Sequence, residues 1–235
     1  MMNPLRYAVY LAPPPEGALW RFGSAVVGRD AASGEAQSGF APAGFDAATW
    51  RGITTEPRRY GFHATIKAPF RLADDASLSD LSTALAELAH GARPFSAGRL
   101  AVSTLTLGET ASFVALTPPA PSAAIAQLEE RVVRGLDAFR APLNDAERAR
   151  RDPTRLTARQ RDAFERWGYP YALADFRLHF TLTNALDEAG RIAETLAHEF
   201  ERRVADPTLV VDALVLFVQK PNGDFVVDQR FPFGD

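Results

Sequence analysis

The sequence predicts a mixed fold of strands and helices, organised as two related lobes with a cleft between them. One observation is that a strand, a helix and a hairpin follow one another twice along the 235 residues, at a nearly constant offset. The other is that each copy begins with a strand that carries a His-x-Thr motif, at residues 63–65 and 179–181. Duplicated lobes produce a pseudo-twofold axis, so one motif would lie on each wall of the cleft.

The first strand is expected over residues 5–11, where β-branched and aromatic side chains precede three prolines. Residues 28–59 are rich in Gly, Ala, Ser and Pro, which predicts a long surface connection with one short helix near 46–51. The first motif strand is expected next, over about 60–70. These elements lead into the first copy of the repeat, which spans about 60–118.

The helix of the first copy should begin at Ser77 or Ser79 and end at Gly91, because leucines recur between them at helical spacing. Strands over 99–107 and 112–117 follow, and the Gly-Glu-Thr segment between them is a hairpin signal.

The second copy, over about 175–231, follows the same order. Two segments separate it from the first copy: an apolar-striped helix over 122–139, and a charged stretch over 144–167 that is typical of a solvated helical face. The elements then expected are a motif strand over 175–184, a helix over 188–204, and strands over 209–220 and 225–231 joined by a turn at 221–224. We expect all 235 residues to form one domain of two lobes.

Composition excludes several classes of function. A net charge of -3 and an isoelectric point near 5.9 disfavour a nonspecific nucleic-acid binder, because such binding depends on an excess of Lys and Arg. A local basic pocket stays compatible with this charge. The absence of cysteine excludes disulfides, thiolate metal sites and cysteine nucleophiles.

The same sequence bears on where the protein acts. Residues 1–20 lack a long apolar core and a small-residue cleavage site. The longest apolar run, residues 213–218, is too short to span a bilayer. We therefore expect a cytoplasmic protein with no membrane partner, whereas the oligomeric state is left open.

Side chains on a strand alternate between its two faces, so each motif gathers polar groups on one face. In the first strand His63, Thr65 and Lys67 would share a face. In the second, Arg177 and His179 would share one with Thr181. An imidazole, a hydroxyl and a cation on the face away from the core suggest phosphate chemistry. The other two histidines, at 90 and 198, lie near the ends of helix-like stretches and lack the motif.

Three longer segments surround these motifs: residues 58–70 (RRYGFHATIKAPF), 167–171 (WGYPY) and 176–183 (FRLHFTLT). They resemble the two-histidine phosphoesterase superfamily, which includes RNA 2',3'-cyclic phosphodiesterases, and in particular a branch known as the phosphonate-metabolism protein. The resemblance implies a bilobal α+β fold, in which each pseudo-symmetric lobe is an antiparallel sheet with helices on its outer face and a central cleft separates the sheets. It also implies metal-free phosphoester chemistry without a cofactor.

Phosphodiester cleavage requires a deprotonated nucleophile, a protonated leaving oxygen and stabilised charge on the phosphate. Two imidazoles can perform both proton transfers, so one of His63 and His179 would activate water and the other would protonate the alkoxide. Which of them is the base is open. The hydroxyls of Thr65 and Thr181 would donate to the nonbridging oxygens.

Other side chains near the motifs have two interpretations each. Lys67 and Arg177 would either add positive charge at the phosphate or form salt bridges at the rim. Tyr60 would either stack on a base or sugar at the mouth of the cleft, or pack within the core or between the lobes. The same choice applies to three further aromatic residues, Trp167, Tyr169 and Tyr171.

The sequence therefore predicts a hydrolase that acts on a small cyclic phosphate or nucleotide-like ester. One alternative is processing or ligation of RNA ends that carry a 2',3'-cyclic phosphate, which the acidic balance disfavours. Another is a noncatalytic protein that binds a phosphorylated metabolite. Histidine in both motifs favours the enzyme, because Lys or Arg would serve binding alone equally well.

Overall fold

The computed structural model describes residues 5–107, 111–149, 153–221 and 223–234. Nine strands form two sheets within this part of the chain. Seven of them make one antiparallel sheet in the order β4-β5-β6-β2-β1-β8-β9, and β3 and β7 pair separately. The strands are β1 (Arg6–Leu11), β2 (Ala64–Phe70), β3 (Phe95–Arg99), β4 (Ala101–Leu107), β5 (Ala111–Thr117), β6 (Phe180–Thr181), β7 (Thr208–Val211), β8 (Ala213–Gln219) and β9 (Phe225–Pro232).

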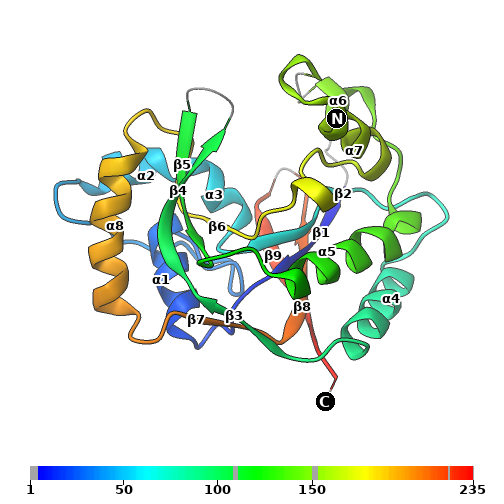
Figure 1. The fold of residues 1–235 in the computed structure, drawn as a ribbon, viewed down its shortest axis with the longest axis horizontal. Coiled ribbons are helices and arrows are strands. Elements are labelled where there is room, and N and C mark those ends of the chain that lie inside the picture. The colour runs from blue at the N-terminus through cyan, green and yellow to red at the C-terminus, as the bar shows by residue number, and fades with distance from the viewer. Residues whose placement is uncertain (1–4, 108–110, 150–152, 222, 235) are drawn as a thin grey trace.

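The helices lie in two groups on either side of this sheet (Figure 1). One group consists of α1, α2, α3 and α8, and the other of α4, α5, α6 and α7. The helices are α1 (Ala18–Val27), α2 (Ala47–Ile53), α3 (Thr55–Tyr60), α4 (Leu78–His90), α5 (Ala123–Gly135), α6 (Asp145–Ala149), α7 (Ala158–Trp167) and α8 (Ala189–Arg203). Short 3-10 turns occur at Asp137–Phe139, Pro153–Arg155 and Leu173–Asp175.

The strands of the two repeats are interleaved in the large sheet. The β4-β5 hairpin follows β2 in the chain but pairs with β6, the motif strand of the second copy. The β8-β9 hairpin follows β6 in the chain but pairs with β1, in the half of the sheet that contains β2. The helices cross over in the same way, since α4 packs on β9 and α8 packs on β4. The β4-β5 hairpin therefore lies directly beside β6, whereas β1 lies between β2 and the β8-β9 hairpin.

The predicted α+β class is confirmed. The prediction placed a separate sheet in each lobe, whereas the structure joins the strands of both halves into one sheet through the β2-β6 pair. The two motif strands thus meet at a single register pair, Ala64 and Phe180.

The local signals at helix ends were reliable. Ser77 caps α4 in a capping box with Asp80, and Gly91 ends the helix. Asp46 and Ser122 cap α2 and α5 by accepting backbone N–H bonds with their side-chain oxygens, without a capping box. The proposed hairpin turn at 108–110 lies outside the described residues, as does residue 222 of the second turn.

Several predicted boundaries were wrong. The second motif strand is only two residues long, because a 3-10 turn occupies Leu173–Asp175 and residues 176–179 belong to no strand. The first motif strand begins at Ala64, because α3 runs on to Tyr60. Helix α1, over residues 18–27, has no counterpart among the predicted elements.

Candidate active site

The two motifs lie on neighbouring strands at the centre of the sheet. Ala64 of β2 is the register partner of Phe180 of β6. In an antiparallel pair, moving one residue along each strand places His63 opposite Thr181 and His179 opposite Thr65. Residues directly opposite each other share a face and have Cβ atoms about 4.5–5.5 Å apart. The four side chains therefore form one polar patch with the histidines on its diagonal.

The opposite face of these strands belongs to the core. Phe62 and Phe180 are fully buried and stack with ring centroids 5.0 Å apart, and Ala64 is buried beside them. Thr65 and Thr181 are half-buried on the polar face. The alternation predicted for the motif strands is thus present from Phe62 to Ile66.

Both imidazoles are held in the same tautomer by a hydrogen bond to a backbone carbonyl. The Nδ1 of His63 lies 2.9 Å from the carbonyl oxygen of Gly61, and the Nδ1 of His179 lies 2.8 Å from that of Arg177. A carbonyl only accepts, so each Nδ1 must carry the proton and donate it. Each Nε2 is therefore left as the reactive nitrogen in the neutral ring. In both motifs the carbonyl lies two residues before the histidine.

The ring of His63 is packed between aromatic side chains. It stacks on Tyr10 of β1 with centroids 3.8 Å apart, and Tyr60 and Phe217 lie 6.0 and 6.2 Å away. The pKa of His63 is lowered to about 4, chiefly by burial and also by the positive charges of His179 and Arg29, while the hydrogen bond to Gly61 opposes the shift. The free imidazole of His63 is therefore neutral at neutral pH.

His179 lies in a similar environment on the second strand. Its ring is 5.5 Å from that of Phe113 of β5, in a tilted arrangement. Burial lowers the pKa of His179, and the hydrogen bond to the Arg177 carbonyl opposes this effect. The Nε2 of His63 is 3.4 Å from the hydroxyl of Thr65, so at least one motif hydroxyl lies next to a reactive nitrogen.

Gly61 shapes the turn from α3 into the first motif. Its φ of +75° belongs to the region that favours glycine, and a Cβ at this position would lie 2.4 Å from the Cβ of Ala31. The buried guanidinium of Arg29 fixes the same turn by donating to the carbonyls of Arg58, Arg59 and Phe225. The carbonyl that orients His63 is thus itself held in place.

The prediction that Lys67 shares a face with His63 and Thr65 is wrong. Across β1, Thr65 is the partner of Tyr10 but Lys67 is the partner of Val9, with a register irregularity between the two pairs. Because neighbouring residues on β1 face opposite ways, this bulge turns Lys67 to the other face. Its side chain is 3% exposed, and its ammonium donates to the carbonyl of Val133 at 3.0 Å, with Asp137 at 3.5 Å.

Helix α5 anchors both motif segments. Lys67, which follows the first motif, donates to the carbonyl of Val133 near the C-terminal end of α5. Glu129 of the same helix accepts a hydrogen bond from the backbone N–H of Leu173 at 3.1 Å. Leu173 precedes the second motif and has a φ of +56°, which is strained for a residue with a side chain. Burial raises the pKa of Glu129 to about 7.

The other residues predicted to bind substrate lie in different environments, and their side chains are exposed or packed against other groups. Arg177 has an exposed side chain and contributes its carbonyl to His179. Tyr60 stacks on Phe225, with ring centroids 5.2 Å apart, and its ring also lies beside that of His63. Trp167 packs against the guanidinium groups of Arg134 and Arg166.

The remaining aromatic pair, Tyr169 and Tyr171, packs edge to face, with ring centroids 5.6 Å apart. The ring of Tyr60 is thus one predicted aromatic group that lies beside a motif histidine.

Three residues at the site were not identified from the sequence: Tyr10, Arg29 and Glu129. Tyr10 looks like an ordinary strand aromatic, and the two charged residues become special only through contacts with distant segments. The sequence carries no signal for their roles beyond their residue type.

A metal centre and a membrane span would each require features that the described residues lack. No three His, Cys, Asp or Glu side chains of the described segments gather as a metal site would require. None of the helices in that same part of the chain has the length and apolar character needed to cross a membrane.

Comparisons with known proteins identify relatives of the chain. A family model described as "Protein of unknown function (DUF1045)" matches residues 65–226. Ribose 1,5-bisphosphate phosphokinase PhnN of Laribacter hongkongensis (strain HLHK9) is 38% identical over 224 residues, which are 93% of this chain and 49% of that protein. The protein of the same name from Janthinobacterium sp. (strain Marseille) is 35% identical over 97% of this chain and 51% of its own length. The chain thus spans about half the length of these relatives.

Solved structures with lower similarity include E. coli LigT complexed with ATP, at 14% identity and a TM-score of 0.42, covering 99% of this chain and 100% of that one. Usb1 of Kluyveromyces marxianus is 10% identical with a TM-score of 0.37, covering 97% and 98% of the two chains.

Proposed function

The chain belongs to the DUF1045 family, and we propose that it is a phosphodiesterase in which His63 and His179 exchange protons with a small cyclic phosphate. The observation that carries this proposal is the matched pair of imidazoles. Each has its Nδ1 committed to a backbone carbonyl, so that both Nε2 atoms are available on one face of the β2-β6 pair.

We assign His63 as the general base. Its low pKa keeps it unprotonated at neutral pH, and the charge of His179 contributes to that low value. Its Nε2 accepts a proton from water as the water oxygen attacks phosphorus. A bound phosphate anion raises the pKa of His179, so its Nε2 takes up a proton from solvent. This Nε2–H then protonates the departing alkoxide as the ring P–O bond breaks. The product is a phosphomonoester with a free hydroxyl, and proton exchange with solvent restores both rings.

The threonine hydroxyls supply the remaining requirement. Thr65 lies opposite His179, and Thr181 lies opposite His63, so a phosphate between the two imidazoles would lie within the reach of both hydroxyls. Donation from these hydroxyls to the nonbridging oxygens would be strongest in the transition state, where the charge on them is greatest. Lys67 has no part in this scheme because it faces the other way.

The names of the relatives suggest a substrate class. They are kinases of ribose 1,5-bisphosphate, and this chain matches about half of their length. The chain itself contains no Gly-x-x-x-x-Gly-Lys-Ser/Thr loop of the kind that cradles nucleotide phosphates. We therefore assign it a different step, the opening of a cyclic phosphate on a phosphorylated ribose. Hydrolysis that leaves the phosphate on the anomeric oxygen of such a ring would yield a ribose bisphosphate, which is the type of molecule that the relatives are named for.

The test is turnover by EDTA-treated protein, followed by 31P NMR, against ribose 5-phosphate 1,2-cyclic phosphate, a nucleoside 2',3'-cyclic phosphate and a linear dinucleotide. We expect the cyclic sugar phosphate to be opened without added metal. His63→Asn and His179→Asn should each lower kcat by about 10²–10⁴-fold. His198→Asn, on the exposed face of α8, is the matched control and should be fully active.

A divalent-ion requirement for turnover would contradict the proposed mechanism. Full activity in either motif variant would contradict the proposed roles of the histidines. Preferential opening of the nucleoside cyclic phosphate would support RNA-end chemistry and overturn the substrate class.

A further inference from the structure

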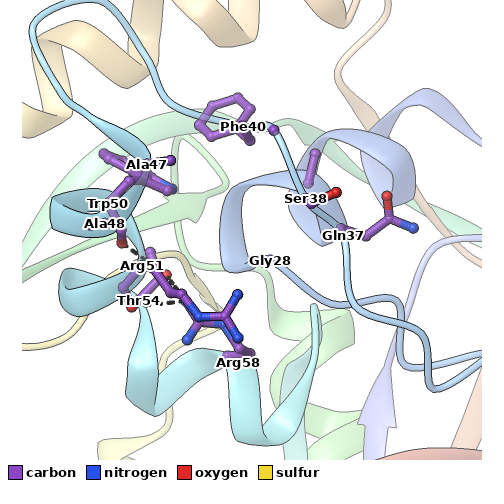
Figure 2. A pocket seen from close by; sticks show the side chains of 12 residues that line it. Gly28, Gln37, Ser38, Phe40, Ala47, Ala48, Trp50, Arg51, Thr54 and Arg58 are labelled. Atoms are coloured by element: carbon purple, nitrogen blue, oxygen red, sulfur yellow. Dashed lines mark hydrogen bonds between the residues drawn. The ribbon is translucent and has the colours of Figure 1, made fainter.

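A pocket of about 230 Å³ lies away from the motif histidines, between the 37–40 loop and the helices α2 and α3 (Figure 2). Figure 2 shows Gln37, Ser38 and Phe40 on one side and the α2 residues on the other, with Arg58 reaching across from α3 toward Gly28. The twelve residues that line the pocket include no Asp, Glu, His or Lys, and their only charged side chains are Arg51 and Arg58.

The two guanidinium groups are close enough to repel each other. Burial lowers the pKa of Arg58 first, and the positive charge of Arg51 lowers it further. Asp224 acts in the opposite direction, but its carboxylate is paired with Arg29 at 3.6 Å. In the described segments of the chain, no carboxylate forms an ion pair with either Arg51 or Arg58. Two cations at one pocket without a counter-charge favour an anionic ligand.

Arg58 is held rigidly in the position that such a ligand needs. Its Nε donates to the carbonyl of Val27 at 3.1 Å, and its Nη2 donates to the carbonyl of Arg51 at 2.8 Å and to the hydroxyl of Thr54 at 2.7 Å. Its Nη1 makes no hydrogen bond with any described residue. The side chain therefore loses little further entropy when it donates to a ligand, which is the advantage of a preorganised guanidinium.

The walls of the pocket suit a small organic molecule. Trp50 and Phe40 are buried and pack together with ring centroids 5.5 Å apart. The indole N–H of Trp50 is already bonded to the carbonyl of Val26, so its ring offers the pocket an apolar surface. Exposed Gln37 and Ser38 add hydrogen-bonding groups at the rim. Apolar walls with a few convergent polar groups are typical of ligand pockets.

We propose that this pocket binds a small phosphorylated molecule through Arg51 and Arg58. Two cations favour a dianion, and the planar guanidinium matches the oxygens of a phosphate group better than a point charge does. The volume fits inorganic phosphate or a compact sugar phosphate. This site is separate from the histidine patch, whose members do not line it.

The experiment is a titration with inorganic phosphate, followed by NMR of the 15N-labelled indoles at constant ionic strength. The three tryptophans give three indole signals. We expect the Trp50 signal to move saturably, whereas that of Trp167 on α7 should be unaffected. Arg51→Gln should weaken binding about tenfold, because it removes one charge-assisted donor. Arg58→Lys should weaken it as well, although it keeps the charge.

Two controls locate the binding. Arg93→Gln removes an exposed guanidinium outside the pocket and should leave the affinity unchanged. His63→Asn should also leave the Trp50 response unchanged, even if the proposed catalytic function is wrong. A Trp50 signal that does not move up to millimolar phosphate would overturn the proposal. So would a response that Arg51→Gln leaves intact, or one that His63→Asn abolishes.

Discussion

Ala64 of β2 is paired with Phe180 of β6, and this one pair sets the relative position of both histidines. Each partner lies next to its motif histidine in sequence, so the antiparallel register brings each His opposite the Thr of the other motif. The two halves of the chain are therefore combined at a single central strand pair. The buried phenyl ring of Phe180 holds that register from the core side, where it stacks on Phe62.

We predict that Gly61→Ala is strongly destabilising. The residue would have to keep a φ of +75° and its Cβ would overlap that of Ala31, which together should lower the free energy of unfolding by about 2 kcal/mol or more. The matched control is Gly52→Ala in α2, where a Cβ meets nothing within 4 Å. That variant should gain up to about 1 kcal/mol. Urea unfolding of both variants measures the difference, and equal stabilities would contradict the account of the turn.

Tyr10→Phe should leave the protein at least as stable as the wild type. The Tyr10 hydroxyl is buried and has no hydrogen-bond partner among the described residues, so its removal relieves a desolvation cost of about 1 kcal/mol or more. The ring that stacks on His63 is kept. Tyr10→Leu removes the ring and should destabilise. Thermal unfolding checks both changes, and a marked loss of stability in Tyr10→Phe would show that the hydroxyl has a partner.

His63 should make the protein less stable as the pH falls. Its pKa is about 4 in the folded protein against 6.5 for an unperturbed histidine, so the unfolded chain binds more protons between these values. The free energy of unfolding should therefore fall by up to about 3 kcal/mol as pH drops from 6.5 to 4. Denaturant titrations across this window should show a shallower fall for His63→Gln. Parallel curves for wild type and variant would refute the low pKa.

Glu129 should act in the opposite direction. Burial raises its pKa from 4.5 to about 7, so the folded protein keeps a proton that the unfolded chain has released. Stability is lost as pH rises from about 4.5 to 7, by up to about 3 kcal/mol. Glu129→Gln retains an oxygen for the Leu173 N–H but cannot ionise. Its stability relative to wild type should therefore rise across this window, and a constant difference would contradict the assignment.

The sequence was most informative where the determinants are local. The ends of α4 follow from Ser77 and Gly91, because capping depends on residues within one helical turn. The face shared by His63 and Thr65 follows from strand alternation. These are the features that a single segment specifies by itself.

Features that depend on distant segments were missed. The bulge that reverses Lys67 exists only in the register of β2 against β1, and the ammonium is then captured by α5. The roles of Arg29 and Glu129 arise because their partners, Phe225 and Leu173, come from remote parts of the chain. The pairing of β2 with β6 likewise depends on distant segments, because β5 of the first half pairs with β6 and β8 of the second half pairs with β1.

The central claim is that the reactive nitrogens of His63 and His179 meet at one phosphorus atom. Long-range 1H–15N NMR of the imidazoles, during a titration with orthovanadate as a phosphate analogue, tests it directly. In the free protein both rings should show the tautomer protonated at Nδ1. Both Nε2 signals should then shift together with a single dissociation constant. Separate dissociation constants, or a response from only one ring, would contradict it.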